Sequence, residues 1–79
     1  MSLRAEQHRA LFFLMTAAAN GATHSLLAAH GFSGAMISRM VNHGLVTVSL
    51  ERFRAGGKMI KVRMVQITAA GRDALAVDN

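Results

Sequence analysis

Five basic side chains fall within twelve residues, on both sides of the pair Gly56-Gly57. They are Arg52, Arg54, Lys58, Lys61 and Arg63, and Glu51 is the only acidic residue near them. Positive charge gathered in this way neutralises the phosphates of nucleic acid and gives affinity with little sequence information. The pattern therefore predicts a phosphate-binding segment. The alternative for any one of these side chains is an ordinary solvated surface residue.

A group of polar residues precedes this segment with the spacing of one helix face. The group comprises Ala35, Ser38, Arg39 and Asn42, with His43 at its end. Arg39 can donate two hydrogen bonds to guanine, Asn42 can pair with adenine, and Ser38 can contact bases or phosphates. A small Ala35 permits close approach and can meet a thymine methyl group. These side chains could read base edges, and the alternative is a helix face exposed to water.

The first element expected is a helix from Leu3 to about Ala19, with Ser2 as its N-cap, because the segment contains good helix formers and no proline. Its middle contains five consecutive apolar residues, which point to every side of a helix. We therefore expect self-association as a homodimer through one flank of this helix. The candidate interface residues are Leu11, Phe12 and Met15. The alternative is a monomer in which the rest of the chain covers this helix on all sides.

Two further helices are expected, and the second of them should carry the polar face. Thr23 can cap a short helix that ends at Gly31, where glycine tolerates a left-handed backbone. Ser33 can cap the next helix, which is expected to run to about His43. The inward stripe of that helix is expected to comprise Met36, Ile37, Met40 and Val41.

Alternating apolar and polar residues predict a two-stranded hairpin, or wing, after these helices. The alternation covers residues 46–51 and returns over residues 60–64. Gly56-Gly57 should form the turn, because adjacent glycines supply the positive φ angles of tight reversals. Beyond Met64 the apolar phase shifts to Val65 and Ile67, so we expect a bulge or strong twist there. Thr68 should then cap a last helix over residues 69–77.

The whole chain is expected to be one α+β domain, residues 1–79, with the order helix, helix, helix, strand, strand, helix. A chain of 79 residues has no room for a second domain, and its 52% hydrophobic content is typical of a folded globule. Nine Lys and Arg against four Asp and Glu give a net charge of +5, which favours polyanions.

Several classes of function are disfavoured. The chain has no cysteine, which excludes disulfides and thiolate sites and suits the cytoplasm. His8, His24, His30 and His43 lack metal-ligand spacing, so no metal or other cofactor is expected. The four carboxylates are scattered, so we do not expect an enzyme. No apolar run is long enough to span a membrane.

Three segments together resemble the winged-helix core of MarR-type bacterial transcriptional regulators. They are Gly44-Leu45-Val46, the hairpin through Gly56-Gly57-Lys58, and the run that begins Ile67-Thr68-Ala69-Ala70-Gly71-Arg72. The resemblance covers roughly residues 22 to 77 and implies that Ser33, Ala35, Ser38, Arg39 and Asn42 face the DNA groove. The family carries additional long helices at both ends that form the dimer and the effector pocket. This chain has a single first helix and a short last one, so no small-molecule effector is expected.

The function predicted from the sequence is sequence-specific binding of double-stranded DNA by a transcriptional regulator. The third helix would enter the major groove, and the basic wing would contact the backbone or minor groove. A homodimer would read a two-fold symmetric site. The alternative is a winged-helix module that binds an acidic protein partner. The polar outer face of the third helix favours DNA.

Overall fold

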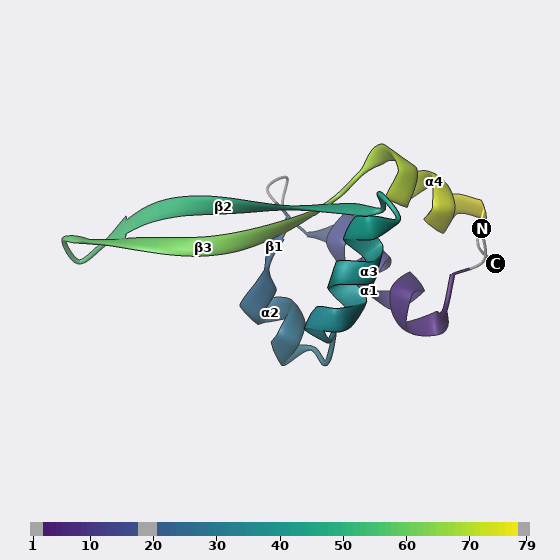
Figure 1. Cartoon of the computed structure of the whole chain (residues 1–79), viewed down its shortest axis with the longest axis horizontal. Coiled ribbons are helices and arrows are strands. Elements are labelled where there is room, and N and C mark those ends of the chain that lie inside the picture. Colours follow the sequence, from purple (N-terminus) through teal and green to yellow (C-terminus); the bar gives the residue numbers. More distant parts are fainter. Residues whose placement is uncertain (1–2, 18–20, 78–79) are drawn as a thin grey trace.

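The computed structural model describes residues 3–17 and 21–77. Its elements are α1 (Ala5–Thr16), β1 (Ala22–Thr23), α2 (His24–Ala29), α3 (Gly34–Asn42), β2 (Val46–Ala55), β3 (Lys58–Ile67) and α4 (Ala69–Val77). The helices gather at one end, and β2 and β3 extend from them as a long hairpin (Figure 1). The molecule is therefore elongated, with extents of 46 × 21 × 21 Å.

The sheet has three antiparallel strands in the order β1-β3-β2. The α+β class is confirmed, but the predicted element order is wrong because it lacks β1. This strand has only two residues, Ala22 and Thr23, which pair with Val65 and Met64 of β3. A two-residue strand shows no periodicity in the sequence. It forms because β3 offers an unpaired edge where the hairpin returns to the helices.

The hairpin keeps one continuous register from Ala55 opposite Lys58 to Val46 opposite Ile67. The expected bulge near Met64 is therefore wrong. The positions of the apolar residues shift by one along the strand because one face of the hairpin is apolar near the helices and the opposite face is apolar farther out. Near the helices, the buried Val46 and Val65 lie on one face. Farther out, Ile60 and Val62 belong to the opposite face, since side chains alternate along a strand.

Three predicted helix caps are confirmed. The side-chain oxygens of Thr23, Ser33 and Thr68 accept backbone N–H bonds from Leu26, Met36 and Gly71 at 3.0, 3.1 and 3.0 Å. Each cap satisfies a donor that the first turn of a helix leaves without a partner. For α1, the cap is Arg4, whose backbone N–H donates to Gln7 Oε1. The helix is therefore shorter than predicted, because it begins at Ala5 rather than Leu3 and ends at Thr16, after which Ala17 has an extended backbone. Ser2 and Ala19 themselves lie outside the described residues.

Glycines occupy the turn positions at which the backbone has a positive φ angle. Gly31 has a φ of 88°, and the hairpin turn uses Gly56 and Gly57 with φ of 56° and 80°. These angles favour glycine, since a side chain would strain the backbone there. The predicted hairpin tip and the predicted end of the second helix are therefore confirmed.

The core lies among the helices and the inner end of the hairpin. Its fully buried large side chains are Leu11, Leu27, Met40, Val46 and Val65, one from each of α1, α2, α3, β2 and β3. Burying a side chain of this size contributes about 1.5–3 kcal/mol. Val41, expected in the inward stripe of the third helix, is exposed. The outer hairpin contributes no buried residue to this core.

Thr68 ties the root of the hairpin to the helices on both sides. Its hydroxyl donates to the Gly44 carbonyl oxygen at 2.6 Å, and its N–H donates to the Leu45 carbonyl oxygen at 3.0 Å. Gly71 lies against Leu45, where a Cβ would clash with that carbonyl oxygen. Because Gly44 directly follows the end of α3, these contacts set the angle between α3 and the hairpin.

Replacing Thr68 with valine should lower the free energy of unfolding by about 1–2 kcal/mol, because the bond to Gly44 and the cap of α4 are both lost. Replacing it with serine keeps the hydroxyl and should cost less than about 1 kcal/mol. Urea denaturation followed by circular dichroism measures both changes. An equal loss in the two variants would contradict a role for the hydroxyl.

Candidate nucleic-acid interface

The outer face of α3 is polar and exposed. Ala35, Ser38, Arg39 and Asn42 are exposed, whereas Met36, Ile37 and Met40 on the same helix are buried. Ser33 precedes the helix as its N-cap, and His43 follows it as its C-cap. All the residues predicted to contact bases thus lie on or beside the exposed side of α3.

The hairpin carries its cations mainly on one face. Residues paired across antiparallel strands share a face, as do residues two apart along a strand. Arg52 pairs with Lys61, Arg54 with Met59 and Leu50 with Arg63. Four of the predicted cations, Arg52, Arg54, Lys61 and Arg63, therefore form one basic face.

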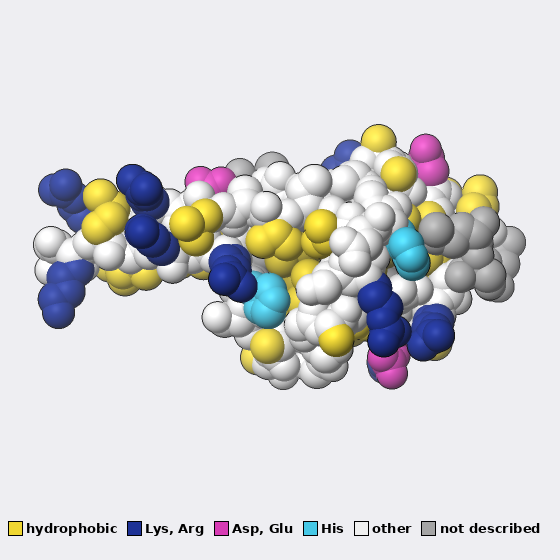
Figure 2. All heavy atoms as spheres, in the orientation of Figure 1, with side chains coloured by type: hydrophobic (Ala, Val, Ile, Leu, Met, Phe, Trp, Pro, Cys, Tyr) yellow, Lys and Arg dark blue, Asp and Glu magenta, His cyan; other side chains and the backbone are white. Residues whose placement is uncertain are grey.

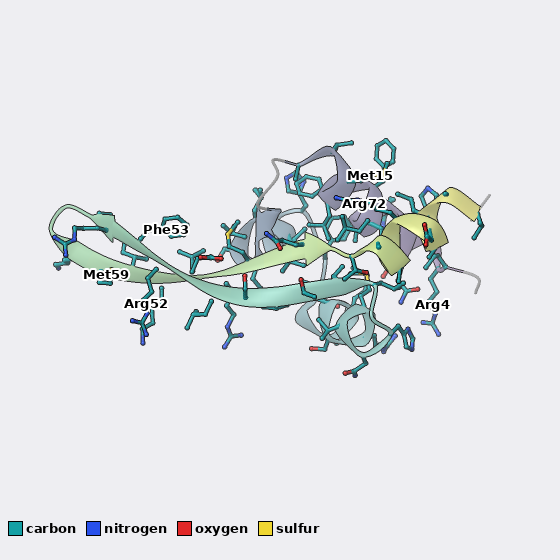
Figure 3. All side chains as sticks on the ribbon, turned by 90° about the horizontal axis from the view of Figure 1, so that it is seen from above. Arg4, Met15, Arg52, Phe53, Met59 and Arg72 are labelled. Carbon is teal, nitrogen blue, oxygen red and sulfur yellow. The ribbon has the colours of Figure 1, made fainter. Side chains whose placement is uncertain are left out.

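The fifth cation, Lys58, pairs with Ala55 on the opposite face. That face also holds Phe53, Ile60, Val62 and Met64, which we call the apolar face. Figure 3 shows the division, with Arg52 and Met59 on one side of the hairpin and Phe53 on the other. The sequence placed these five cations in one segment, but the register separates Lys58 from the rest.

The basic face of the hairpin lies on the same side as the polar face of α3. A concavity of about 260 Å³ joins the two, and Ser38 and Asn42 of α3 line it together with Val48 and Arg63 of the hairpin. Ile37, Val41 and His24 complete its lining. Figure 2 shows dark blue side chains along the hairpin and beside this junction. The helix and the hairpin therefore form one continuous surface.

Arg39 lies outside this concavity. It lines a separate depression with Ser33, Ala35, Arg4 and Glu6, on the side of α3 that faces the start of α1. The predicted base-contacting residues thus divide into two sets along α3, one near the hairpin and one near α1. A ligand that touched both sets would have to extend along the exposed face of the helix.

His24 is a lining residue that the sequence did not indicate. It is the first residue of α2, and its half-buried ring lies beside Gly34, the first residue of α3. From the sequence, His24 is only one of four histidines that lack the spacing of metal ligands. No local signal could have revealed its place, because the concavity combines residues from α2, α3, β2 and β3.

The three predicted dimer residues differ in exposure. Leu11 has no exposed surface, because it packs inside the core of a single chain, and so it offers nothing for a partner to contact. Phe12 and Met15 are 53% and 46% exposed. They line a hollow of about 280 Å³ between α1 and α4, with Leu75 and Arg72 among the other lining residues. Phe12 and Met15 therefore give α1 an apolar surface that a partner could contact, whereas Leu11 does not contribute to it.

A larger hollow of about 530 Å³ lies between α1 and the turn from α2 to α3. Its lining includes Phe12, Phe13 and Phe32, and the ring of Phe13 lies 4.7 Å from that of His30. None of the residues of the basic face lines this hollow. It is therefore separate from the candidate interface.

Within residues 3–17 and 21–77, no group of three or more His, Asp or Glu side chains could hold a metal ion. Over the same ranges, no helix has the length and apolar character needed to cross a membrane.

Comparison with protein-family models, curated proteins and solved structures finds no match for this chain. The function is therefore inferred from the arrangement of side chains described above.

Proposed function

We propose that this chain is a winged helix-turn-helix domain that binds double-stranded DNA sequence-specifically and regulates transcription in the cytoplasm. The observation that carries the proposal is the shared surface of α3 and the hairpin, joined at Ser38, Asn42 and Arg63. An α-helix fits the major groove of DNA. A basic ribbon beside it suits the sugar–phosphate backbone or the adjacent minor groove.

The segments that resemble MarR-type regulators support the proposal because they have a joint physical role. Gly44 adopts a φ of 72° after α3, and its carbonyl oxygen accepts the Thr68 hydroxyl. Gly71 leaves room for the Leu45 carbonyl oxygen. The Gly-Leu-Val and Thr-x-x-Gly segments therefore fit each other, and together they hold a hairpin beside a helix.

In the proposed complex, the side chains of α3 would read base edges. Arg39 would donate two hydrogen bonds to a guanine, and Asn42 would pair with an adenine. The cations of the basic face would neutralise phosphates and add affinity that is largely independent of sequence.

The alternative function is binding of an acidic protein partner. It is favoured by the apolar side chains among the cations, since Leu50 and Met59 on the basic face are 55% and 58% exposed. A protein surface would bury such side chains, whereas DNA phosphates would not. The polar face of α3 argues for DNA, because protein-binding helix faces are usually apolar.

The test of the proposed function is a fluorescence anisotropy titration against a pool of randomised duplexes, followed by sequencing of the retained DNA. Enrichment of a partly palindromic motif is expected, with log K falling by about 0.9 per phosphate contact for each unit of log salt concentration. Weak binding with no enriched motif that vanishes at physiological salt would contradict the proposal and favour a protein partner.

Replacing Arg39 with alanine should cost about 1–3 kcal/mol of binding free energy on the enriched site and relax base choice at one position. The control is alanine at Arg9, an exposed arginine of α1 that lines the separate aromatic hollow. That variant should bind like the wild type. If alanine at Arg39 weakened binding to every sequence equally, the base-reading role would be wrong.

Arg54 and Lys58 allow a matched comparison of the two hairpin faces, because both lie near the tip on opposite faces. Replacing Arg54 with glutamine should reduce the salt dependence of log K by about 0.9. The same change at Lys58 should have little effect. Titrations at several salt concentrations measure both slopes, and equal changes would refute binding through the basic face.

The homodimer is also a proposal, and its interface would use Phe12 and Met15 rather than Leu11. Replacing both exposed residues with serine should halve the mass measured by light scattering without unfolding the chain, because neither belongs to the core. Serine at Leu26, which is exposed on α2, serves as the control. A wild-type protein with the mass of one chain would overturn this proposal.

A further inference from the structure

We propose that His24 and Arg63 together bind one phosphate of the DNA backbone, at the boundary between α3 and the hairpin. The inference rests on the proposed function and deepens it, because it adds a residue, His24, that neither the sequence nor the resemblance assigned to DNA binding. The ligand is the phosphodiester group of duplex DNA.

The pairing of β1 with β3 brings the two side chains together. Ala22 lies opposite Val65 and Thr23 opposite Met64. The strand ends at Thr23, and His24 follows it as the first residue of α2, close to the part of β3 that carries Arg63. Both residues line the concavity of about 260 Å³ at the root of the hairpin. Figure 2 shows a histidine beside a basic side chain where the hairpin meets the helices.

The lining of this concavity combines the apolar side chains of Ile37, Val41 and Val48 with four polar or basic residues that can bind an anion. His24 and Arg63 supply positive charge or N–H donors, and Ser38 and Asn42 add a hydroxyl and an amide. No residue that lines the concavity carries a carboxylate. Hydrogen bonds from cationic groups to phosphate oxygens are stronger than those between neutral groups.

The geometry of duplex DNA indicates which anion would occupy the concavity. A sugar–phosphate strand separates each major groove from the neighbouring minor groove. If α3 lies in the major groove and the hairpin at the adjacent minor groove, one strand must pass between them. His24 and Arg63 lie at that boundary, so they would meet a phosphate rather than a base. Such contacts set the register of a protein on DNA.

A contact through histidine predicts that DNA affinity depends on pH. Histidine gains its positive charge as the pH falls from about 8 to 5, and the charged ring binds phosphate more tightly. The charged group that faces His24 across the concavity is Arg63 of β3, whose charge is constant over this range. The lining residues of α3 and β2 are uncharged. Affinity should therefore rise as the pH falls.

The experiment measures the affinity for a fluorescein-labelled mixed-sequence duplex at about pH 6 and about pH 8, two values between which histidine side chains in general change charge. We expect the wild type to bind roughly three- to tenfold more tightly at the lower pH. His24→Gln should weaken binding at the lower pH and reduce the difference, and His43→Gln at the C-cap of α3 measures the share that the second histidine of the interface contributes. His24→Arg should bind tightly at both pH values, a gain that a misfolded variant could not show.

Two further variants complete the design. His30→Gln, on an exposed histidine of the α2–α3 turn outside the concavity, should retain the pH dependence of the wild type. Arg63→Gln should reduce the salt dependence of log K by about 0.9.

The outcomes separate the two proposals. A wild type that binds no duplex at either pH overturns the proposed function and the phosphate site with it. A wild type that binds duplex while His24→Gln keeps the full pH dependence overturns the phosphate site alone. Reduction of the pH dependence in His24→Gln, together with tight binding by His24→Arg at the higher pH, supports the site.

Discussion

The side chain of Thr68 makes the contact on which the arrangement of this molecule depends. Its hydroxyl donates to the Gly44 carbonyl oxygen and accepts the Gly71 N–H, so one atom joins the end of α3 to the start of α4. This junction acts together with the buried Val46 and Val65 to hold the hairpin at its angle to α3, because the outer half of the hairpin buries nothing against the core. The surface shared by α3 and the basic face follows from that angle.

The continuous register lets one face of the hairpin both anchor it to the core and carry the candidate binding surface. Near the helices, one face contributes Val46 and Val65 to the core. Farther out, the same face carries Arg52, Arg54, Lys61 and Arg63. This change from apolar to basic residues needs no bulge, because the backbone pairing is unbroken and only the residue types differ along the face. Packing of the inner half therefore orients the cations of the outer half toward the side where α3 lies.

The short strand β1 has a larger consequence than its length suggests. By pairing with β3, it holds the start of α2 against the hairpin, so that His24 and Arg63 line the same concavity beside α3. Three segments far apart in the sequence thus line one concavity. Under the proposed function, this is where the DNA backbone would pass, and its recognition would depend on the sheet as much as on the helix.

The sequence by itself determined the α+β class, the caps at Thr23, Ser33 and Thr68, the glycine turns and the polar outer face of α3. These features depend on neighbouring residues and on periodicity, which a sequence displays directly. DNA binding stays a prediction. Only the tertiary structure decided that β1 exists, that Leu11 is buried, that Lys58 lies apart from the other cations and that His24 and Arg63 line one concavity. Each of these depends on strand register or on packing between distant segments, which local sequence does not encode.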